Sequence, residues 1–343
     1  MNIDLVVPWV DGSDIEHIKT KNRYKQLLEK KVNDEVIGLA RFKDNGELKY
    51  LLRSIEKNAK FIRYVFLVTN GQIPKWLNIN HPKIKIVTHS QIMPKEALPT
   101  FNSSAIETCI ANIPDLSDNF LYANDDFIIA KPINEKFFFT KEGYPISRLL
   151  PVFHIRQKGV YVKKINFTLN IFYKKFHKNF NLTEHHNIDA FYKPDVLSCI
   201  NEFKEDFDRT CNSRFRAENN ISKHIWSLYS FYIGHSKIKG YYISKILIYL
   251  VSIINGIKSL FSNVNQYMYN GNNTSKKSTF LKIKKQIYRF ILNSTSFSNY
   301  EDYNIKYISL FCINDNEFSN DADRKRSMDF LNKLFPNKSS FEI

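Results

Sequence analysis

The first 130 residues alternate between short apolar runs and segments with helical periodicity. The apolar runs predict four buried β-strands, at residues 3–9, 64–69, 83–89 and 119–123. Segments with apolar side chains at helical spacing precede or separate these strands, at residues 16–31, 41–58 and 104–112. Strands joined by helical crossovers are typical of parallel sheets, so the pattern predicts an α/β fold with helices flanking a mostly parallel sheet.

The second half of the chain has a less regular pattern. Residues 132–165 have the mixed aromatic composition of short strands and loops. Helical spacing predicts helices at residues 166–180, 198–208, 226–232 and 321–335. A late apolar run at residues 307–314 predicts a strand, which is a candidate neighbour of the earlier sheet.

Positive charge is concentrated in one part of the chain. The formal net charge is +16, and residues 219–300 contain eleven Lys or Arg and no Asp or Glu. Within this segment, residues 241–261 predict an amphipathic helix and residues 280–292 a basic helix. Two interpretations stay open: an in-plane contact with a membrane surface, or an accessory bundle on the main domain. Nucleic acid is the least favoured anionic partner, because the motifs of the common nucleic-acid folds are absent.

These changes in composition divide the chain into three parts. We predict an α/β core at residues 1–234, a basic helical insertion at 235–305, and a strand and helix at 306–343 that return to the core. The N-terminus lacks the basic region and apolar run of a secretory leader, and no run of about 18 uncharged apolar residues occurs. The four cysteines form neither a CxxC pair nor a zinc-binding spacing. We therefore expect a cytoplasmic protein with reduced thiols, either free or peripheral on the inner face of the plasma membrane.

A carboxylate pair at the end of the fourth predicted strand is the clearest chemical signal. A polar loop at residues 99–104 leads into a helix that carries Glu107, and the next strand ends in Asp125 and Asp126. Adjacent carboxylates at the end of an apolar strand repel each other and lose hydration, and a divalent cation removes that cost. Oxygen ligands suit Mg²⁺ or Mn²⁺. The alternative is a solvated turn with two free acids, because Asp is common in turns.

Two loops contain residues typical of nucleotide and phosphate binding. Asp11 and Gly12 follow the first strand, where a tight loop before a helix often begins a nucleotide site, although Asp-Gly is also a common turn dipeptide. Arg214 and Arg216 lie close together in a polar loop, and arginine suits bidentate contacts to phosphate. Ordinary surface arginines explain this pair equally well.

A pair of adjacent histidines, His185 and His186, precedes Asp189. If this segment is helical, His186 and Asp189 share a face, so the carboxylate is a candidate to orient the imidazole. A helix-capping or surface histidine is the alternative interpretation.

Several long motifs occur along the chain: IDLVVPWVDGSD at the N-terminus, NGQIPKWLN, LPTFNSSAIE, IPDLSDNFLYANDD, HHNID, and FCINDN followed by FPNKSSFE. In these motifs and their order the chain resembles the Stealth family of sugar-1-phosphate transferases, which includes bacterial capsular polysaccharide phosphotransferases and the animal GlcNAc-1-phosphotransferase. The resemblance covers nearly the whole chain except about residues 235–305. It implies a Rossmann-like, GT-A-like core and a UDP-sugar donor. The reaction it implies transfers sugar-1-phosphate to a hydroxyl of an oligosaccharide or polysaccharide acceptor and releases UMP.

The resemblance also implies roles for individual residues. Asp126 matches the family's metal-binding aspartate, and we expect Asp125 to assist it. Glu107 matches the active-site glutamate, His186 the catalytic histidine and Arg216 the phosphate-binding arginine. The residues expected along the nucleotide sugar are Asp11, Gly12, Asn102, Ser103 and Arg214.

These assignments predict a phosphoryl transfer in which a metal ion and Arg216 neutralise charge and His186 accepts the acceptor proton. Asp315 is a weaker candidate for the same site. The large recognition inserts of the animal members are absent, which argues against a protein-targeting substrate. The alternatives are a metal-dependent GT-A glycosyltransferase that releases UDP, and a membrane-associated protein that binds polyanions without catalysis.

Overall fold

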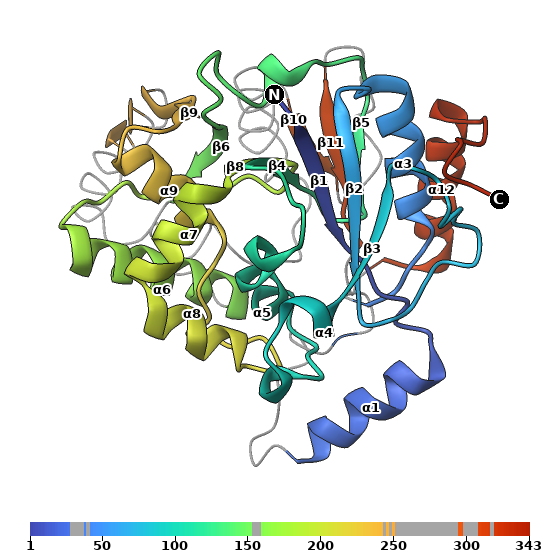
Figure 1. The fold of residues 1–343 in the computed structure, drawn as a ribbon, viewed down its shortest axis with the longest axis horizontal. Coiled ribbons are helices and arrows are strands. Elements are labelled where there is room, and N and C mark those ends of the chain that lie inside the picture. The colour runs from blue at the N-terminus through green and yellow to red at the C-terminus, as the bar shows by residue number, and fades with distance from the viewer. Residues whose placement is uncertain are drawn as a thin grey trace, which may run out of the picture.

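The computed structural model describes residues 1–27, 38, 42–152, 159–242, 245–246, 249–250, 294–297, 308–315 and 319–343 (Figure 1). A five-stranded sheet with the order β3-β2-β1-β4-β8 forms its centre. The strands are β1 (Ile3–Pro8), β2 (Ile62–Thr69), β3 (Ile84–Thr88), β4 (Asn119–Tyr122) and β8 (Asp189–Tyr192). The first four run parallel and β8 lies antiparallel beside β4. The predicted α/β class with a mostly parallel sheet is therefore confirmed.

Helices cover both faces of this sheet because successive side chains of each strand point to opposite faces. Leu5 and Val7 of β1 belong to the core beneath α3 (Glu47–Asn58) and α12 (Asp321–Leu334). Val6 belongs to the opposite core, which is covered by helices on the left of Figure 1. These helices are α5 (Ser103–Thr108), α7 (Lys193–Glu202), α8 (Lys204–Cys211) and α9 (His224–Tyr232).

A second sheet continues from the central one. It has the order β10-β11-β5, formed by β10 (Ser294–Phe297), β11 (Leu310–Ile313) and β5 (Phe127–Ile129). The late strand predicted from the apolar run is thus present as β11, antiparallel to β5. β10 falls within the segment expected to be an insertion, yet it pairs with β11. The predicted amphipathic helix lies largely outside the described residues and the basic helix lies wholly outside them, so the three-part division stays a prediction.

A third sheet corrects the prediction for the histidine segment. Its order is β7-β6-β9, formed by β7 (Leu182–Glu184), β6 (Ile146–Pro151) and β9 (Lys237–Lys239). His186 and Asp189 therefore do not share a helix face: they lie in and after the turn that joins β7 to β8. Strands of three or four residues are too short for their alternation to be distinguished from helical spacing.

The remaining helices complete the layers around the sheets. They are α1 (Ile15–Gln26), α4 (His89–Ile92) and α6 (Val160–Phe176), with short 3-10 helices at Lys95–Ala97, Ile110–Asn112 and Glu135–Phe137. The helix predicted at residues 198–208 is divided between α7 and α8, and α6 begins six residues before its predicted start at residue 166. Among the described residues, none of the helices combines the length and apolarity that crossing a bilayer requires.

Candidate active site

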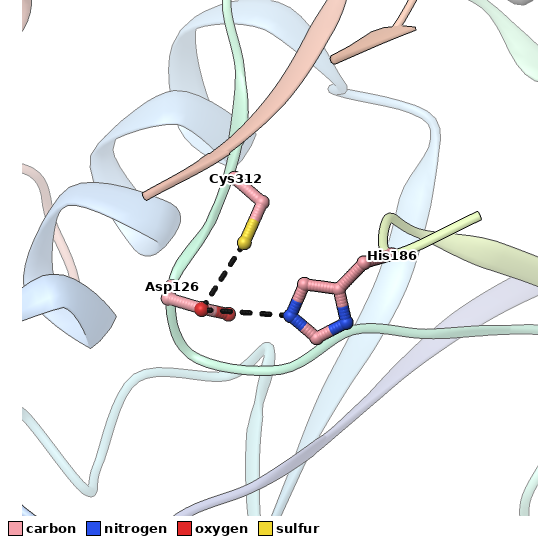
Figure 2. Close-up of side chains that lie close together, drawn as sticks. All are labelled: Asp126, His186 and Cys312. Carbon is pink, nitrogen blue, oxygen red and sulfur yellow. Dashed lines mark hydrogen bonds and ion pairs between the residues drawn. The ribbon is translucent and has the colours of Figure 1, made fainter. Parts of the chain in front are cut away.

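Asp126, His186 and Cys312 lie together although they are far apart in the sequence (Figure 2). Asp126 belongs to the turn between β4 and β5, where the chain passes from the first sheet to the second. The antiparallel pairing of β11 with β5 places Cys312 opposite Phe127, next to Asp126. The pairing of β8 with β4 brings the turn that carries His186 to the same place. In Figure 2 the His186 ring and the Cys312 thiol approach Asp126 from different directions.

Asp126 interacts with both neighbours through one oxygen. Its Oδ2 lies 3.8 Å from Nε2 of His186 and accepts a hydrogen bond from the Cys312 thiol at 3.1 Å. Burial, reinforced by Asp126, raises the pKa of Cys312, so this thiol is protonated and acts as the donor. Burial alone would lower the pKa of His186, but the Asp126 carboxylate outweighs that effect and the pKa is raised. His186 also packs its ring edge-on against Phe127, with a centroid distance of 4.9 Å.

The carboxylates around Asp126 form an environment suited to a divalent cation. Oδ1 of Asp126 is buried without a hydrogen-bond partner among the described residues. The pKa of Asp125 lies well above its ordinary value because of burial and the nearby charges of Asp126, Glu47 and Asp44. Burial likewise raises the pKa of Glu47 to about 7. An unpartnered oxygen among mutually repelling acids is the chemistry that Mg²⁺ or Mn²⁺ stabilises, so these residues fit the expected metal.

Glu107 lies on α5 and faces the same region. Its Oε1 accepts a hydrogen bond of 3.2 Å from the hydroxyl of Tyr122, at the end of β4. Its Oε2 is buried and has no hydrogen-bond partner among the described residues. Burial raises the pKa of Glu107, and the nearby positive charges of Lys164, Lys223 and Arg216 oppose that rise. The carboxyl group is therefore buried, with three positive side chains and Glu184 within electrostatic reach.

The loop after α8 directs its two arginines differently. Nη2 of Arg216 donates to Oγ of Ser103 at 2.8 Å, which places this guanidinium beside the start of α5 and within electrostatic reach of Glu107. Arg214 donates to the carbonyl oxygens of Pro99 and Glu96 at 2.8 and 3.0 Å, so its guanidinium holds the loop backbone. The two guanidinium groups therefore lie in different places, Arg216 beside the start of α5 and Arg214 against the loop backbone.

Asn102, expected beside the nucleotide sugar, is fully buried and acts within the protein. Its side chain accepts a hydrogen bond from the backbone of Ser104 and donates to the carbonyl of Ser213 and to Asn220. These bonds tie the start of α5 to the arginine loop. Asn102 is thus placed to position Arg216 rather than to contact a ligand.

Lys223 joins the two ends of the histidine turn. Its ammonium donates to Glu184 at 2.7 Å and to Asp189, and all three side chains are at least 89% buried. Asp189 is therefore paired with Lys223, and its predicted role as the partner of the His186 imidazole is corrected. Sequence patterns did not reveal Lys223, because its partners lie 34 and 39 residues away.

The four predicted catalytic residues form two pairs, Asp126 with His186 and Glu107 with Arg216, which share Glu184 and Lys223 as charged neighbours. Asp126 contacts His186 directly. Glu184 and Lys223 act on the pKa values of both His186 and Glu107, and Arg216 acts on that of Glu107. Lys223, Glu184 and Cys312 are further members of this site that sequence patterns missed.

Asp11, Gly12 and Asp315 make their described contacts with other parts of the protein. The Asp11 carboxylate accepts hydrogen bonds from the backbone and side chain of Ser13, and the backbone N–H of Gly12 donates to the Phe42 carbonyl at 2.7 Å. Asp315 pairs with Arg324 of α12 at 2.8 Å, so its carboxylate is already engaged there.

Comparisons with known proteins agree with the motifs. The family model described as Stealth protein CR1, conserved region 1, matches residues 1–29, and Stealth protein CR2, conserved region 2, matches residues 41–147. These ranges include Asp11, Glu107 and Asp126, whereas His186 and Arg216 lie beyond them. A solved structure of the galactosyltransferase LgtC with donor and acceptor sugar analogs aligns with a TM-score of 0.41 and 9% identity, over 98% of this chain and 96% of that chain.

Curated relatives have consistent names. The capsular polysaccharide phosphotransferase SacB of Neisseria meningitidis serogroup A is 35% identical over 227 residues, covering 64% of this chain and 41% of SacB. CpsJ of Streptococcus thermophilus, also named a capsular polysaccharide phosphotransferase, is 46% identical over 140 residues, covering 41% of this chain and 58% of CpsJ. The exopolysaccharide phosphotransferase cps2G of Lactiplantibacillus plantarum is 45% identical over 144 residues, covering 42% of this chain and 41% of cps2G. The chain thus spans about half the length of these relatives. Two regions of this chain thus match the conserved regions of the Stealth family, and the relatives it resembles are named capsular or exopolysaccharide phosphotransferases.

Proposed function

We propose that the protein is a capsular or exopolysaccharide phosphotransferase, which transfers a hexose- or HexNAc-1-phosphate from a UDP-sugar to a hydroxyl of a growing glycan. The observation that carries the proposal is the convergence of Asp126 and His186 from separate sheets, with Glu107 and Arg216 in the same electrostatic neighbourhood. The names of the relatives support the same chemistry.

The reaction forms a bond between the acceptor oxygen and the β-phosphorus of the donor. The bond from that phosphorus to the oxygen bridging the two phosphates breaks, and UMP leaves. His186 takes the proton of the acceptor hydroxyl, because an imidazole beside a carboxylate is a suitable base near neutral pH. The product is a phosphodiester, so repeated transfer builds a polymer of sugars joined through phosphate.

The remaining residues neutralise and align charge, which is the main requirement of phosphoryl transfer. Asp126, assisted by Asp125, would hold Mg²⁺ or Mn²⁺, which supplies positive charge for the donor phosphates. Arg216 binds a phosphate oxygen from the side of α5. The buried Glu107 carboxylate binds the acceptor or shares the proton with His186. Cys312 orients Asp126 through its thiol hydrogen bond.

The predicted basic insertion has a role in this scheme. A phosphodiester polymer is polyanionic, so the acid-free segment at residues 219–300 guides the product or holds the enzyme on the inner face of the plasma membrane.

Incubation with a panel of UDP-sugars and an acceptor oligosaccharide tests the proposal. Release of UMP, with a product heavier by one sugar phosphate in mass spectrometry, supports it. Release of UDP would instead identify a glycosyltransferase. If the unaltered protein forms no product, and the Asp126→Asn and His186→Ala variants keep its biological effect, the protein binds its ligand without catalysis.

A further inference from the structure

Lys164 on α6 has no part in the function proposed so far, although it faces the same site. Its Nζ lies 3.2 Å from Oγ of Ser104, on α5. Glu107 and Glu184 raise its pKa and Arg216 lowers it, so all three lie within its electrostatic reach. Burial is the largest influence, and the pKa of Lys164 is below its ordinary value.

The contrast with Lys223 shows what Lys164 lacks. Lys223 has two carboxylates within ion-pair distance, and its pKa is raised despite burial. Among the described residues, Lys164 has no carboxylate at that distance, and its hydrogen-bond partner is a neutral hydroxyl. A cation partly removed from water without a paired anion is costly to hold, and an anionic ligand offsets that cost.

The position of Lys164 is set by buried contacts. Thr168, one turn further along α6 and fully buried, donates to the Lys164 carbonyl at 2.9 Å and accepts from the backbone N–H of Ser222 at 2.9 Å. This bond fixes α6 against the segment that begins α9. Lys164 is therefore held beside α5 by the core rather than by a surface ion pair.

Two neighbouring serines hold the two cations side by side. Ser103 accepts from Arg216 and Ser104 accepts from Lys164, so both positive groups converge at the start of α5, near Glu107. We propose that Lys164 and Arg216 form a two-cation clamp for the phosphate that is transferred, with Lys164 as a substrate-binding residue. The inference rests on the proposed function, because it takes a nucleoside diphosphate sugar as the donor.

Isothermal titration calorimetry with UDP and with UMP, both in the presence of Mg²⁺, tests the clamp. UDP carries the second phosphate and UMP does not. Lys164→Met is expected to weaken UDP binding about 10- to 100-fold, the size of a lost charge-assisted contact, and to change UMP binding less than about threefold. Lys164→Arg should recover part of the affinity. Lys163→Met is the matched control, because Lys163 pairs with Glu218 on the exposed side of α6.

The outcomes separate the clamp from the proposed function. UDP binding by Lys164→Met that equals that of the unaltered protein overturns the clamp but leaves the phosphotransferase intact. Equal weakening of UDP and UMP also overturns it, since a Lys164 that only supports Glu107 and α5 would act in that way. If the unaltered protein binds neither nucleotide, the proposed donor is wrong and the clamp falls with it. Thermal unfolding checks each variant, and Lys164→Gln replaces Lys164→Met if the latter does not fold.

Discussion

Removal of the Lys223 ammonium should destabilise the protein strongly, because it leaves two buried carboxylates without their paired cation. Lys223→Met keeps the length and apolar stem of the side chain but removes the charge that pairs with Glu184 and Asp189. Breaking a buried ion pair from one side costs about 3–5 kcal/mol. Despite burial, Lys223 and Lys164 lower the pKa of Glu184 to about 2 from 4.5. The pKa of Asp189 moves the other way, to about 6, because burial outweighs its pairing with Lys223, so we expect a loss at the lower end of that range.

A triple variant separates the lost pairing from lost packing. Lys223→Met combined with Glu184→Gln and Asp189→Asn removes all three charges at nearly constant volume, so it should recover most of the loss. Lys204→Met is the control: Lys204 pairs with Asp208 on the exposed face of α8, and its loss should cost less than about 1 kcal/mol.

Urea unfolding followed by tryptophan fluorescence measures these differences at pH 7. Trp226 is buried three residues along the chain from Lys223 and contacts Phe191 of β8, so its emission reports on this region. A loss of less than about 1 kcal/mol in the free energy of unfolding for Lys223→Met would refute the reasoning, because removing one partner of a buried ion pair normally costs several times more. A triple variant no more stable than the single variant would also refute it, since packing rather than charge would then explain the loss.

Three further predictions test other parts of the structure. Asp126→Asn should lower product formation about 100-fold or more, whereas Asp321→Asn at an exposed position should not; equal activity of the two variants would exclude a charge role for Asp126. Gly12→Ala should destabilise the first loop by about 1–3 kcal/mol in urea unfolding, because its Cβ would meet the Phe42 carbonyl oxygen at 2.1 Å; an unchanged midpoint would contradict this close approach. Burial lowers the pKa of His89 to about 4. The unfolded chain therefore binds a proton between pH 6.5 and 4 that the folded protein excludes, and stability falls on acidification by up to about 1.4 kcal/mol per pH unit. His89→Gln should remove that slope, and an identical pH dependence in the variant would show that His89 does not titrate in this way.

The parts of the fold that sequence patterns predicted are those in which local pattern and burial agree. β1, β2 and β4 are apolar runs in the interior of the central sheet, so their pattern is set by the fold itself; β3 is an edge strand with Lys85 exposed and is less buried than predicted. The helix considered for the segment of His186 and Asp189 is wrong, because β7 and β8 are strands of only three and four residues whose paired strands lie elsewhere in the chain. Pairing over such distances depends on tertiary contacts that a short window does not contain.

In the site, too, some residues can be identified from sequence motifs and others only from tertiary contacts. Asp126, Glu107, His186 and Arg216 belong to motifs that resemble a family, and in the structure they form two pairs that share Glu184 and Lys223 as charged neighbours. Cys312 is an apolar-strand residue by pattern, and only its position across from β5 shows that its thiol donates to Asp126.

The location of the site follows from the way the chain changes sheets. Between β4 and β5 it leaves the central sheet for the second sheet, and that turn carries Asp126. Between β7 and β8 it leaves the third sheet for the central one, and that turn carries His186. Where a chain leaves a sheet, backbone groups lose their neighbours in the ladder, so polar side chains and ligands can satisfy groups that a continuous sheet would occupy. Two such turns meet here because β8 pairs with β4, and that pairing, more than any single motif, brings the acid and the histidine together.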